Sequence, residues 1–427
     1  MASGSTNVFG IPFPLQNDAV DVAGDMEEMA SFIDGLIDEN VGTPNVENVL
    51  YVSKSGDDAN DGGNLGNSFL TIKAALAAAT SGTTVFVKSG DYTEANPVTI
   101  PARVAVVGDS LRTVTVRPQT VNQDIFYVNN GCYVTGITFR DHENPSAAFA
   151  FNPDGSAGFI STSPYIQNCS SITTTGKGMY IDGSAALGLK SMVTDSYTQF
   201  NQGGMGVHVD NSGYAQLVSI FTICCDYGFL CTNGGACSIT NSNSSFGTYA
   251  LVAEGLSSVL DSGLTDGVDQ LGTSIVVDGL SQPPAVNDVI SFNSEEVYYT
   301  ISNATLISSG KYTIEVLELI EVAIPNNTSV DVYKKSFISS SSHTFEYVGS
   351  GNELFSALPA AGGIPVQENE IVESDGGSVY FTSTDQRGDF RIGGDLTINR
   401  SDGTITGRTF DRSLFAVLTP YILAIEG

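Results

Sequence analysis

Two segments of the chain repeat one side-chain pattern at an offset of 28 residues. Residues 178–182 read Gly-Met-Tyr-Ile-Asp, and residues 206–210 read Gly-Val-His-Val-Asp. If these segments are neighbouring strands of one parallel sheet, about 4.8 Å apart, side chains at equal positions stack on one face. The stacked polar pairs would then be Tyr180 with His208 and Asp182 with Asp210.

Two carboxylates held about 5 Å apart match the geometry of a retaining glycosidase. Such chemistry needs one neutral and one ionised carboxyl group, with pKa values separated by burial. The surrounding sequence is rich in Gly, Ser and Thr, which predicts a solvated flank where burial is difficult. We therefore expect Tyr180, Asp182, His208 and Asp210 to bind carbohydrate at most, and a merely polar ladder is the other interpretation. An enzymatic role stays open but is not favoured.

Strands and turns recur between residues 80 and 255 with a period of 20 to 28 residues. The apolar periodicity within them is two rather than 3.6, which excludes helical repeats. Because each coil can bury its inward face only against its neighbours, the repeat predicts a parallel β-helix. The repeated strands are expected at 178–182, 206–210, 228–232 and 248–252, with a second series at 165–172, 190–197, 215–222 and 236–243.

Alternation within these strands assigns one side of each strand to the core. A charge at Val209 should therefore destabilise the fold, whereas Asp210→Asn on the outside should be almost silent for stability. The predicted inward columns are Met179, Val207, Phe229 and Tyr249, and then Ile181, Val209, Cys231 and Leu251.

The composition favours a β-rich protein with few charges. The 427 residues include 17 Lys and Arg against 47 Asp and Glu, which gives a net charge of −30. This charge argues against binding to nucleic acid or anionic lipid. No apolar stretch reaches the length of a membrane span, and the first residues lack a secretion signal. The common nucleotide, metalloprotease and serine-hydrolase motifs are missing from the sequence, so no cofactor is expected.

Six cysteines lie between residues 132 and 237. In a long chain without a secretion signal, buried reduced thiols are their expected state. The group between Cys224 and Cys237 lacks paired CxxC motifs and nearby histidines, so we predict no metal there. A turn rich in Asp and Asn at residues 57–61 could hold Ca²⁺, but an Asx-rich turn that caps the following helix fits it better.

An amphipathic helix is predicted over residues 17–40. Its apolar positions are spaced alternately four and three residues apart, which is a heptad seam that buries itself against neighbouring helices. Pro-containing segments separate this helix from the rest of the chain, so self-association or anchoring is favoured over packing on its own domain. The seam consists of Ala19, Ala23, Met26, Ala30, Ile33 and Ile37.

Residues 49–63 combine a short apolar strand with an Asp-, Asn- and Gly-rich turn, and residues 69–76 and 82–92 follow as a helix and a strand. Together these segments resemble the entry of pectate-lyase-like right-handed β-helices. The resemblance implies a first strand, a capping helix and the first coils. Ile72, Leu76 and Ala79 fall on one helical side, which supports the helix independently. The fold carries lyases, hydrolases, phage spikes and inactive adhesins, so the resemblance does not decide activity.

A small β domain is expected to interrupt the repeat between residues 262 and 335. Five alternating segments predict antiparallel strands of a small barrel or sandwich, and residues 336–350 then resume the strand pattern of a final coil. Short strands after residue 376 predict a β meander with a hairpin turn at 401–403. The apolar end, 414–425, needs a surface to cover it, either on its own chain or in a trimer. The five segments are 274–277, 289–292, 296–301, 312–317 and 330–333.

Four C-terminal segments, His343–Gly351, Glu368–Glu373, Gly377–Gly393 and Gly403–Phe410, carry a second resemblance. They are similar to tail-fibre or baseplate-associated structural proteins of contractile-tailed phages of cyanobacteria. Near the other end, Ile11-Pro-Phe-Pro and the stretch from Asp18 to Asp25 resemble attachment segments of phage fibres. The resemblance implies a virion protein that is synthesised in the host cytoplasm, forms a homotrimer and contacts other tail or baseplate proteins.

The sequence therefore predicts an all-β chain in four parts. They are an attachment arm at 1–46, a parallel β-helix at 47–261, an inserted small β domain at 262–335 and a C-terminal module at 336–427. The expected function is that of a phage tail fibre or tailspike-like protein that contacts host surface polysaccharide. The alternatives are a polysaccharide depolymerase with glycosidase or lyase activity, and a purely architectural collar or baseplate component.

Overall fold

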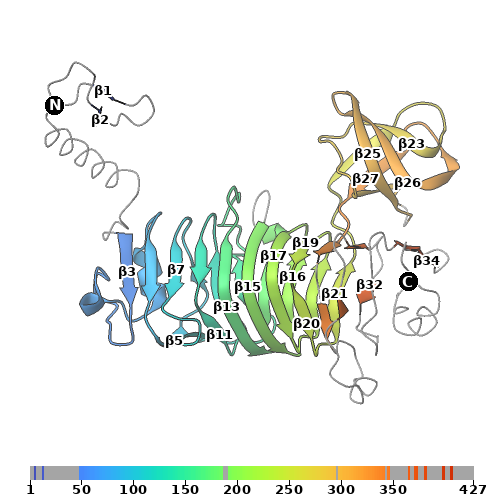
Figure 1. Ribbon diagram of the computed structural model, residues 1–427. Coiled ribbons are helices and arrows are strands. Elements are labelled where there is room, and N and C mark those ends of the chain that lie inside the picture. Colours follow the sequence, from blue (N-terminus) through green and yellow to red (C-terminus); the bar gives the residue numbers. More distant parts are fainter. Residues whose placement is uncertain are drawn as a thin grey trace, which may run out of the picture.

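The computed structural model describes residues 48–185, 191–294, 297–341 and 344–346, together with short strands nearer the two ends of the chain. Parallel strands stack into an elongated body, and a separate barrel joins this body near its last coils (Figure 1). The body is the parallel β-helix that the repeat predicts. Among the described residues, no helix has the length and apolar character needed to cross a membrane.

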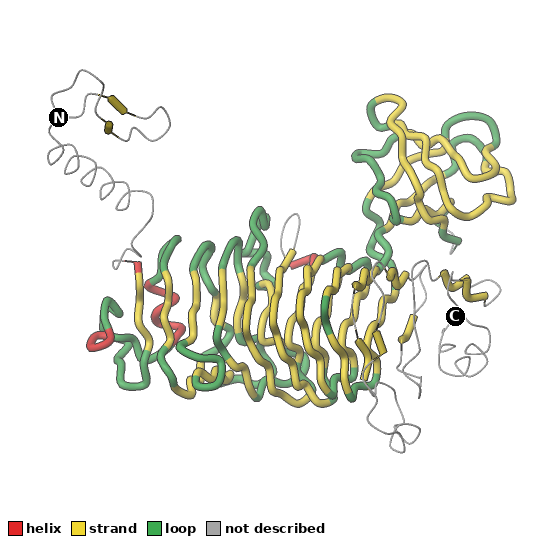
Figure 2. The backbone as a smooth tube through the Cα atoms, viewed as in Figure 1, coloured by secondary structure: helices red, strands yellow, loops and turns green. Residues whose placement is uncertain are grey.

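The coils contribute strands to three faces, which Figure 2 shows as successive layers of strand joined by loops. The first face contains β3 (Val49–Val52), β4 (Thr84–Val87), β7 (Ala105–Gly108), β10 (Tyr133–Thr135), β13 (Tyr165–Thr174), β15 (Ser191–Gln202), β17 (Tyr214–Ile223), β19 (Ala236–Thr240) and β28 (Phe337–Ser341). The second face contains β5 (Gly90–Glu94), β8 (Val114–Pro118), β11 (Thr138–Arg140), the later halves of β13, β15 and β17, then β20 (Asn243–Ser245) and β29 (Thr344–Glu346). The third face contains β6 (Val98–Thr99), β9 (Phe126–Val128), β12 (Ala147–Phe151), β14 (Lys177–Asp182), β16 (Met205–Asp210), β18 (Tyr227–Thr232) and β21 (Tyr249–Glu254).

Single residues with positive φ turn the chain from one face to the next. Asn168, Ser196, Ser219 and Asn241 have φ between 48° and 56° and stack where the first face bends into the second. Asn reaches this left-handed conformation more readily than most residues, and its side chain can bond locally. Asn241 Nδ2 donates to Ser219 Oγ at 3.2 Å, so the corner is tied from coil to coil. A second stacked corner, between the second and third faces, consists of Thr175, Gly203, Cys224 and Phe246.

The core of the body confirms the predicted inward columns over three coils. Side chains of both columns are completely buried in β14, β16 and β18. The two strand pairs between them bring these residues into register, so each inward residue lies directly over its equivalent in the next coil. The confirmed residues are Met179, Val207 and Phe229 in one column and Ile181, Val209 and Cys231 in the other.

In the fourth coil the predicted register is wrong by two residues. Tyr249 pairs with Tyr227 and is only half-buried, whereas Leu251 pairs with Phe229 and fills the core. A glycine precedes the first inward residue in each of the three earlier strands, but Ala250 takes this position in β21. The glycine that marks the register in the other coils is therefore missing here.

Helix α2 (Ile72–Ala78) covers the N-terminal end of the core. Ile72 and Leu76 are buried, and the partly buried Ala79 packs on the same cluster. The three residues therefore lie on one side of the helix, as predicted. The helix ends at Ala78, so Gly82, with φ of 90°, belongs to the following turn rather than to the helix cap.

The turn at residues 57–61 is an Asx-rich turn that supports this helix. Asp58 Oδ1 accepts hydrogen bonds from the backbone N–H groups of Leu70 and Thr71, at 2.9 and 2.8 Å. Asp57 and Asp61 each accept a bond from the backbone two residues further on. Backbone N–H groups therefore bond one carboxylate oxygen of each of these aspartates, and a short 3-10 helix, η2 (Leu65–Asn67), follows.

The domain between β21 and β28 is a closed antiparallel barrel with its own apolar core. Its strand order is β22-β23-β26-β25-β24-β27, so six strands form it where the sequence predicts five. The additional strand is β22. The strands are β22 (Asp261–Thr265), β23 (Gln270–Asp278), β24 (Val289–Phe292), β25 (Tyr299–Ser308), β26 (Lys311–Ile324) and β27 (Ser329–Tyr333).

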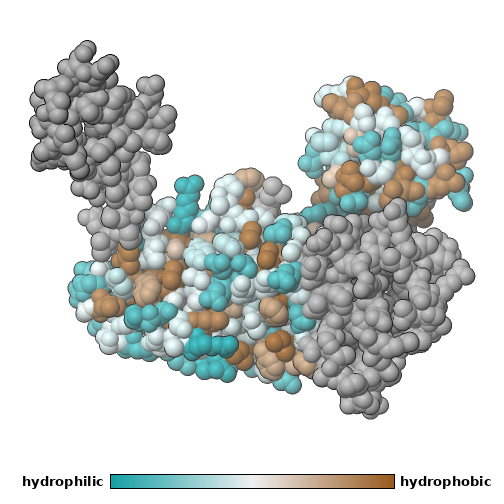
Figure 3. Space-filling model, in the orientation of Figure 1, coloured by the Kyte–Doolittle hydropathy of each residue, from teal (hydrophilic) through white to brown (hydrophobic). Residues whose placement is uncertain are grey.

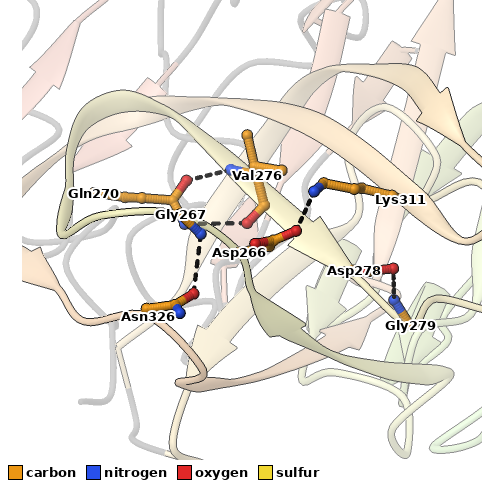
Figure 4. A network of polar contacts seen from close by, with 8 residues as sticks. All are labelled: Asp266, Gly267, Gln270, Val276, Asp278, Gly279, Lys311 and Asn326. Carbon is orange, nitrogen blue, oxygen red and sulfur yellow. Dashed lines mark hydrogen bonds and ion pairs between the residues drawn. The ribbon is translucent and has the colours of Figure 1, made fainter.

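Polar contacts support the irregular start of β23 (Figure 4), where the register against β26 shifts twice. The side-chain amide of Gln270 donates to the Val276 carbonyl at 3.1 Å and accepts a bond from the Val276 N–H. Lys311 forms an ion pair with Asp266. These contacts connect the irregular start of β23 to its regular later part, and the residue after β22 to β26.

The barrel enters and leaves the body at one place. Leu256 and Lys335 form an isolated antiparallel bridge, and the N–H of Ser257 donates to the Lys334 carbonyl at 2.8 Å. Beyond this junction, β28 pairs in parallel with β19, and β29 pairs in parallel with β20. The chain therefore resumes its coil after the barrel.

The last coil is bordered by strands of opposite direction. β30 (Ile364–Pro365) pairs with β29, β31 (Glu370–Glu373) with β28, and β32 (Val379–Phe381) with β21, each of them antiparallel. Two short hairpins lie nearer the ends of the chain: β1 (Gly4–Ser5) with β2 (Pro12–Phe13), and β33 (Thr397–Asn399) with β34 (Thr404–Thr406). The predicted arm helix at 17–40, its seam from Ala19 to Ile37, and the apolar end segment at 414–425 lie outside the described residues.

Candidate functional site

The outer side of the third face brings the four predicted polar side chains together. Parallel pairing of β14 with β16 sets Tyr180 opposite His208 and Asp182 opposite Asp210. The ring centroids of Tyr180 and His208 lie 5.0 Å apart with an angle of 37° between the ring planes. The stacking that the sequence predicts for these residues is therefore present.

Hydrogen bonds surround the carboxylate of Asp210. Its Oδ1 atom accepts from the Asn211 N–H at 2.9 Å, from Thr232 Oγ1 at 2.8 Å and from Asn233 Nδ2 at 2.8 Å. The Tyr180 hydroxyl donates to Oδ2 at 3.2 Å. Asp210 is thus fixed by a backbone N–H of its own coil and by side chains from both neighbouring coils.

The carboxylate of Asp182 is held in a similar way. The Ser184 N–H and hydroxyl donate to Oδ1 at 2.8 and 2.6 Å, and Asn211 Nδ2 donates to the same atom at 2.9 Å. Ser184 belongs to the short 3-10 helix η3 (Gly183–Ala185). Burial acts to raise the pKa of Asp182, but hydrogen bonds from Ser184, Asn211 and Tyr180 outweigh it and lower that pKa below its usual range. Asp182 is therefore ionised at neutral pH.

Lys177 also belongs to this site, although alternation from Met179 predicts that it faces inward. Its Nζ atom lies 4.1 Å from the centroid of the Tyr180 ring, a cation–π contact. Gly178 breaks the alternation because it faces the core: a Cβ there would lie 1.7 Å from Oε1 of the buried Gln199. Burial lowers the pKa of Lys177, against the opposing effect of nearby aspartates.

The site is more buried than the predicted solvated flank. Asp210 and Lys177 are each 9 % exposed. Burial, with Lys177 adding to it, lowers the pKa of His208 to about 4, so its imidazole is neutral at pH 7. His208 Nε2 lies 2.9 Å from Thr232 Oγ1, and its buried Nδ1 atom has no hydrogen-bond partner in the part of the chain that the structure describes. The prediction of a solvent-washed ladder is therefore wrong.

Thr232, Asn211 and Asn233 are the contributors that the sequence does not single out. Thr232 occupies the position of Asp210 in the next coil, so extending the repeat column by one strand would have found it. Asn211 and Asn233 follow the column directly, with φ of 48° and 50°. An Asn at the same turn in two successive coils is the sequence feature that could have identified them.

The site combines hydrogen-bond acceptors, a donor and a positive charge. Asp182 is an ionised acceptor, His208 is neutral, the Tyr180 hydroxyl is a donor, and Lys177 supplies a positive charge beside an aromatic ring. A glycosidase needs a carboxyl group that stays protonated, and the hydrogen bonds to Asp182 favour the opposite state. Within the described ranges, no cluster of three or more His, Cys, Asp or Glu side chains has the arrangement of a metal site.

The six cysteines are free thiols, and five of them are buried. Burial raises the pKa of Cys132 to about 11 and those of Cys169 and Cys225 to about 12. Cys231 and Cys237 lie with their Sγ atoms 3.6 Å apart in the core. The predicted burial is confirmed for these five, whereas Cys224 lies at a half-exposed corner.

Comparison with known proteins adds little beyond the fold. A family of proteins of unknown function, DUF1565, matches residues 54–214, which include β14 and β16 of the candidate site. No curated protein matches the chain. Its similarity to a rhamnogalacturonan lyase has 12 % identity and a TM-score of 0.31, over 47 % of this chain and 70 % of the other.

Two further solved structures are similar at a comparable level. A pectin methylesterase in complex with a hexasaccharide has 15 % identity and a TM-score of 0.25, over 46 % of this chain and 54 % of the other. The ORF18 protein of Geobacillus virus E2 has 12 % identity and a TM-score of 0.21, over 73 % of this chain and 83 % of the other. The chain is a β-helix protein, and the stacked strands themselves establish this.

Proposed function

We propose that this chain is a structural protein of a phage virion, a homotrimeric tail fibre or tailspike-like component that binds host surface polysaccharide. The observation that carries the binding role is the set of stacked rings and hydrogen-bonded carboxylates on the third face. The phage assignment is supported by the resemblance of the two ends of the chain to fibre and baseplate-associated proteins. Other tail or baseplate proteins would be its partners in the particle.

The candidate site offers the contacts that a sugar requires. An aromatic face such as that of Tyr180 packs against the C–H groups of a sugar ring. The carboxylates of Asp182 and Asp210 accept hydrogen bonds from sugar hydroxyls, and Lys177 attracts acidic sugars despite the net charge of −30. Because hydrogen bonds inside the protein already orient these groups, little freedom is lost on binding.

The test is to incubate the full chain with purified polysaccharide from the host surface. We expect a weak binding isotherm and no new reducing ends or 4,5-unsaturated uronates. Tyr180→Ala should weaken binding at least about tenfold, because it removes the stacking ring. Tyr165→Ala is the matched control, since it removes a half-buried tyrosine from the first face and should leave binding unchanged.

Each other outcome assigns the chain to a different class. Released oligosaccharide that disappears in Asp182→Asn or Asp210→Asn would make the protein a depolymerase. A virion protein with no affinity for the polysaccharide would be an architectural component. Absence of the chain from purified particles, examined by mass spectrometry, would refute the virion assignment.

A further inference from the structure

An apolar strip lies on the outer side of the second face, apart from the candidate site. Phe200 on β15 and Phe221 on β17 are 39 % and 42 % exposed, and Phe246, after β20, is 50 % exposed. The half-buried Ile172 and Ile223 stand in register with Phe200 on the two neighbouring strands. We call these five residues the apolar strip.

The strip concentrates side chains that a soluble surface usually covers. Of the four phenylalanines that are exposed among the described residues, three belong to it, and the fourth is Phe159 in a loop. Large apolar side chains gathered on one exposed sheet face indicate an interaction surface.

Between β13 and β20, the two columns of this face that hold the strip carry no charge. From β13 to β20, one column of this face contains Ser170, Thr198, Phe221 and Asn243, and the next contains Ile172, Phe200, Ile223 and Ser245. Arg140 and Glu346 stand at the two ends of this uncharged stretch. The third face, by contrast, presents Lys177 and two aspartates.

In the proposed trimer with threefold symmetry, an uncharged surface such as the strip is better suited to the interface than the charged third face. Near a threefold axis each residue meets its own copies, so a charged residue there would repel itself. For copies of a chain with a net charge of −30, contact through an uncharged surface avoids bringing carboxylates of different copies together. Because the strip runs across successive coils, copies that meet along it must lie side by side with their coils parallel.

We infer that the apolar strip of the second face is the surface through which three copies of this chain associate around an axis parallel to the stack of coils. The inference rests on the proposed trimer and adds its interface. It leaves the candidate site on the neighbouring third face free to meet a polysaccharide.

The experiment compares two double variants of the full chain by light scattering. The wild type should have three times the chain mass of 44.8 kDa. Phe200→Glu with Phe221→Glu places six carboxylates at the interface and should raise the concentration for dissociation at least about a hundredfold. The control, Leu317→Glu with Leu319→Glu, charges two residues of β26 that are 64 % and 61 % exposed and should stay trimeric.

A cysteine variant provides a second measurement that does not depend on destabilisation. Phe221→Cys should form intermolecular disulfides on mild oxidation, above the wild-type background, whereas Leu317→Cys should not. Far-UV circular dichroism checks that each variant keeps its fold.

The outcomes separate this inference from the proposed function. A monomeric wild type would remove the trimer from the proposed function and this interface with it. A trimeric wild type whose Phe200→Glu, Phe221→Glu variant stays equally trimeric, with no Phe221→Cys crosslink, would leave the trimer standing and overturn the interface.

Discussion

At the scale of single residues, the fold holds His142 where its ring can only be neutral. Its Nε2 atom lies 2.8 Å from the carbonyl oxygen of Lys177, and its buried Nδ1 atom has no partner among the described residues. Burial lowers the pKa of His142 to about 4, below the value near 6.5 of an unfolded chain. Between these pH values the unfolded state binds more protons, so stability falls as the pH drops through the window.

We therefore predict that His142→Gln makes stability less sensitive to acid. Glutamine can keep a hydrogen bond to Lys177 but has no proton to gain. Between pH 7 and pH 5, the wild type should lose about 2 kcal/mol more unfolding free energy than the variant, as measured by urea denaturation at each pH. Parallel pH profiles for the two proteins would contradict the buried, neutral state of this ring.

Asp210 and its neighbour Val209 give a second prediction at this scale. Val209→Asp places an unpaired charge in the core and should cost several kcal/mol. The Asp210 carboxylate accepts four hydrogen bonds, and Asp210→Asn replaces one of its oxygens with an NH₂ group that cannot accept them. We therefore expect the variant to lose about 1–3 kcal/mol of unfolding free energy, rather than the negligible change predicted from the sequence. Urea denaturation of both variants and of the wild type measures the difference. Equal losses would show that the inward and outward assignments are wrong.

The candidate site shows how far the sequence reaches at this scale. Alternation and the 28-residue offset are enough to pair Tyr180 with His208, because both depend only on strand register. The position of Lys177 could not be predicted, since it depends on Gly178 facing the core and so breaking the alternation. The burial of the site could not be predicted either, because strand register places side chains opposite one another but does not show how deeply their neighbours cover them.

At the scale of elements, the start of helix α2 is capped by Glu94, a residue of strand β5 that is distant in the sequence. The carboxylate of Glu94 is 1 % exposed and accepts hydrogen bonds from the N–H groups of Ile72 and Lys73, at 2.8 and 3.0 Å. Burial raises the pKa of Glu94, and the two N–H groups at the start of the helix act against that rise. The helix dipole favours the negative charge at this end.

Replacing Glu94 should show how much the cap contributes. Glu94→Leu leaves one buried and one partly buried N–H group without the acceptor they share and should cost about 2–4 kcal/mol of unfolding free energy. Glu94→Gln keeps a carbonyl oxygen for one of them and should cost roughly half as much. Urea midpoints of both variants against the wild type measure this. If Gln and Leu destabilise equally, the hydrogen bonds to the helix are not the source of the effect.

Elements were predicted well where apolar alternation marks them and missed where it does not. The first parts of β13, β15 and β17 follow the predicted segments because buried, mostly apolar residues alternate there with more exposed ones, whereas the later part of β15 buries polar residues such as Gln199 and Asn201 and continues past the predicted end. Strand β22 has Gly263 and Thr265 on its buried side, so no apolar pattern reveals it. A Cβ at Gly263 would lie 2.7 Å from the Asp278 carbonyl oxygen, which explains the glycine.

At the scale of the whole molecule, the barrel is attached so that the body does not need it. Its two connecting segments pair with each other through Leu256 and Lys335, and its apolar core is separate from that of the body. Apolar side chains are visible over much of its surface (Figure 3), and Val268 and Val322 are 89 % and 75 % exposed. The barrel is thus a distinct unit carried at one place on the stack.

We predict that residues 258–334 can be removed. A chain in which two glycines join Ser257 to Lys335 should keep the β-helix, because β28 can still pair with β19 in the same register. Thermal unfolding followed by circular dichroism should give a midpoint within a few degrees of that of the full chain. A shortened chain that cannot fold would show that the barrel contributes to the stability of the last coils. A matched insertion of two glycines after Gly267, in a barrel loop, controls for the added residues.

The antiparallel strands β30, β31 and β32 affect whether molecules can stack end to end. A stack of parallel coils offers an open row of hydrogen-bonding groups at its end, on which the first coil of another molecule could continue the stack. Among the described residues, each of the three faces instead finishes on a strand that runs the other way, so another molecule could not continue the stack with a further parallel coil in the same register. These final strands therefore act against end-to-end growth of the stack into a fibril.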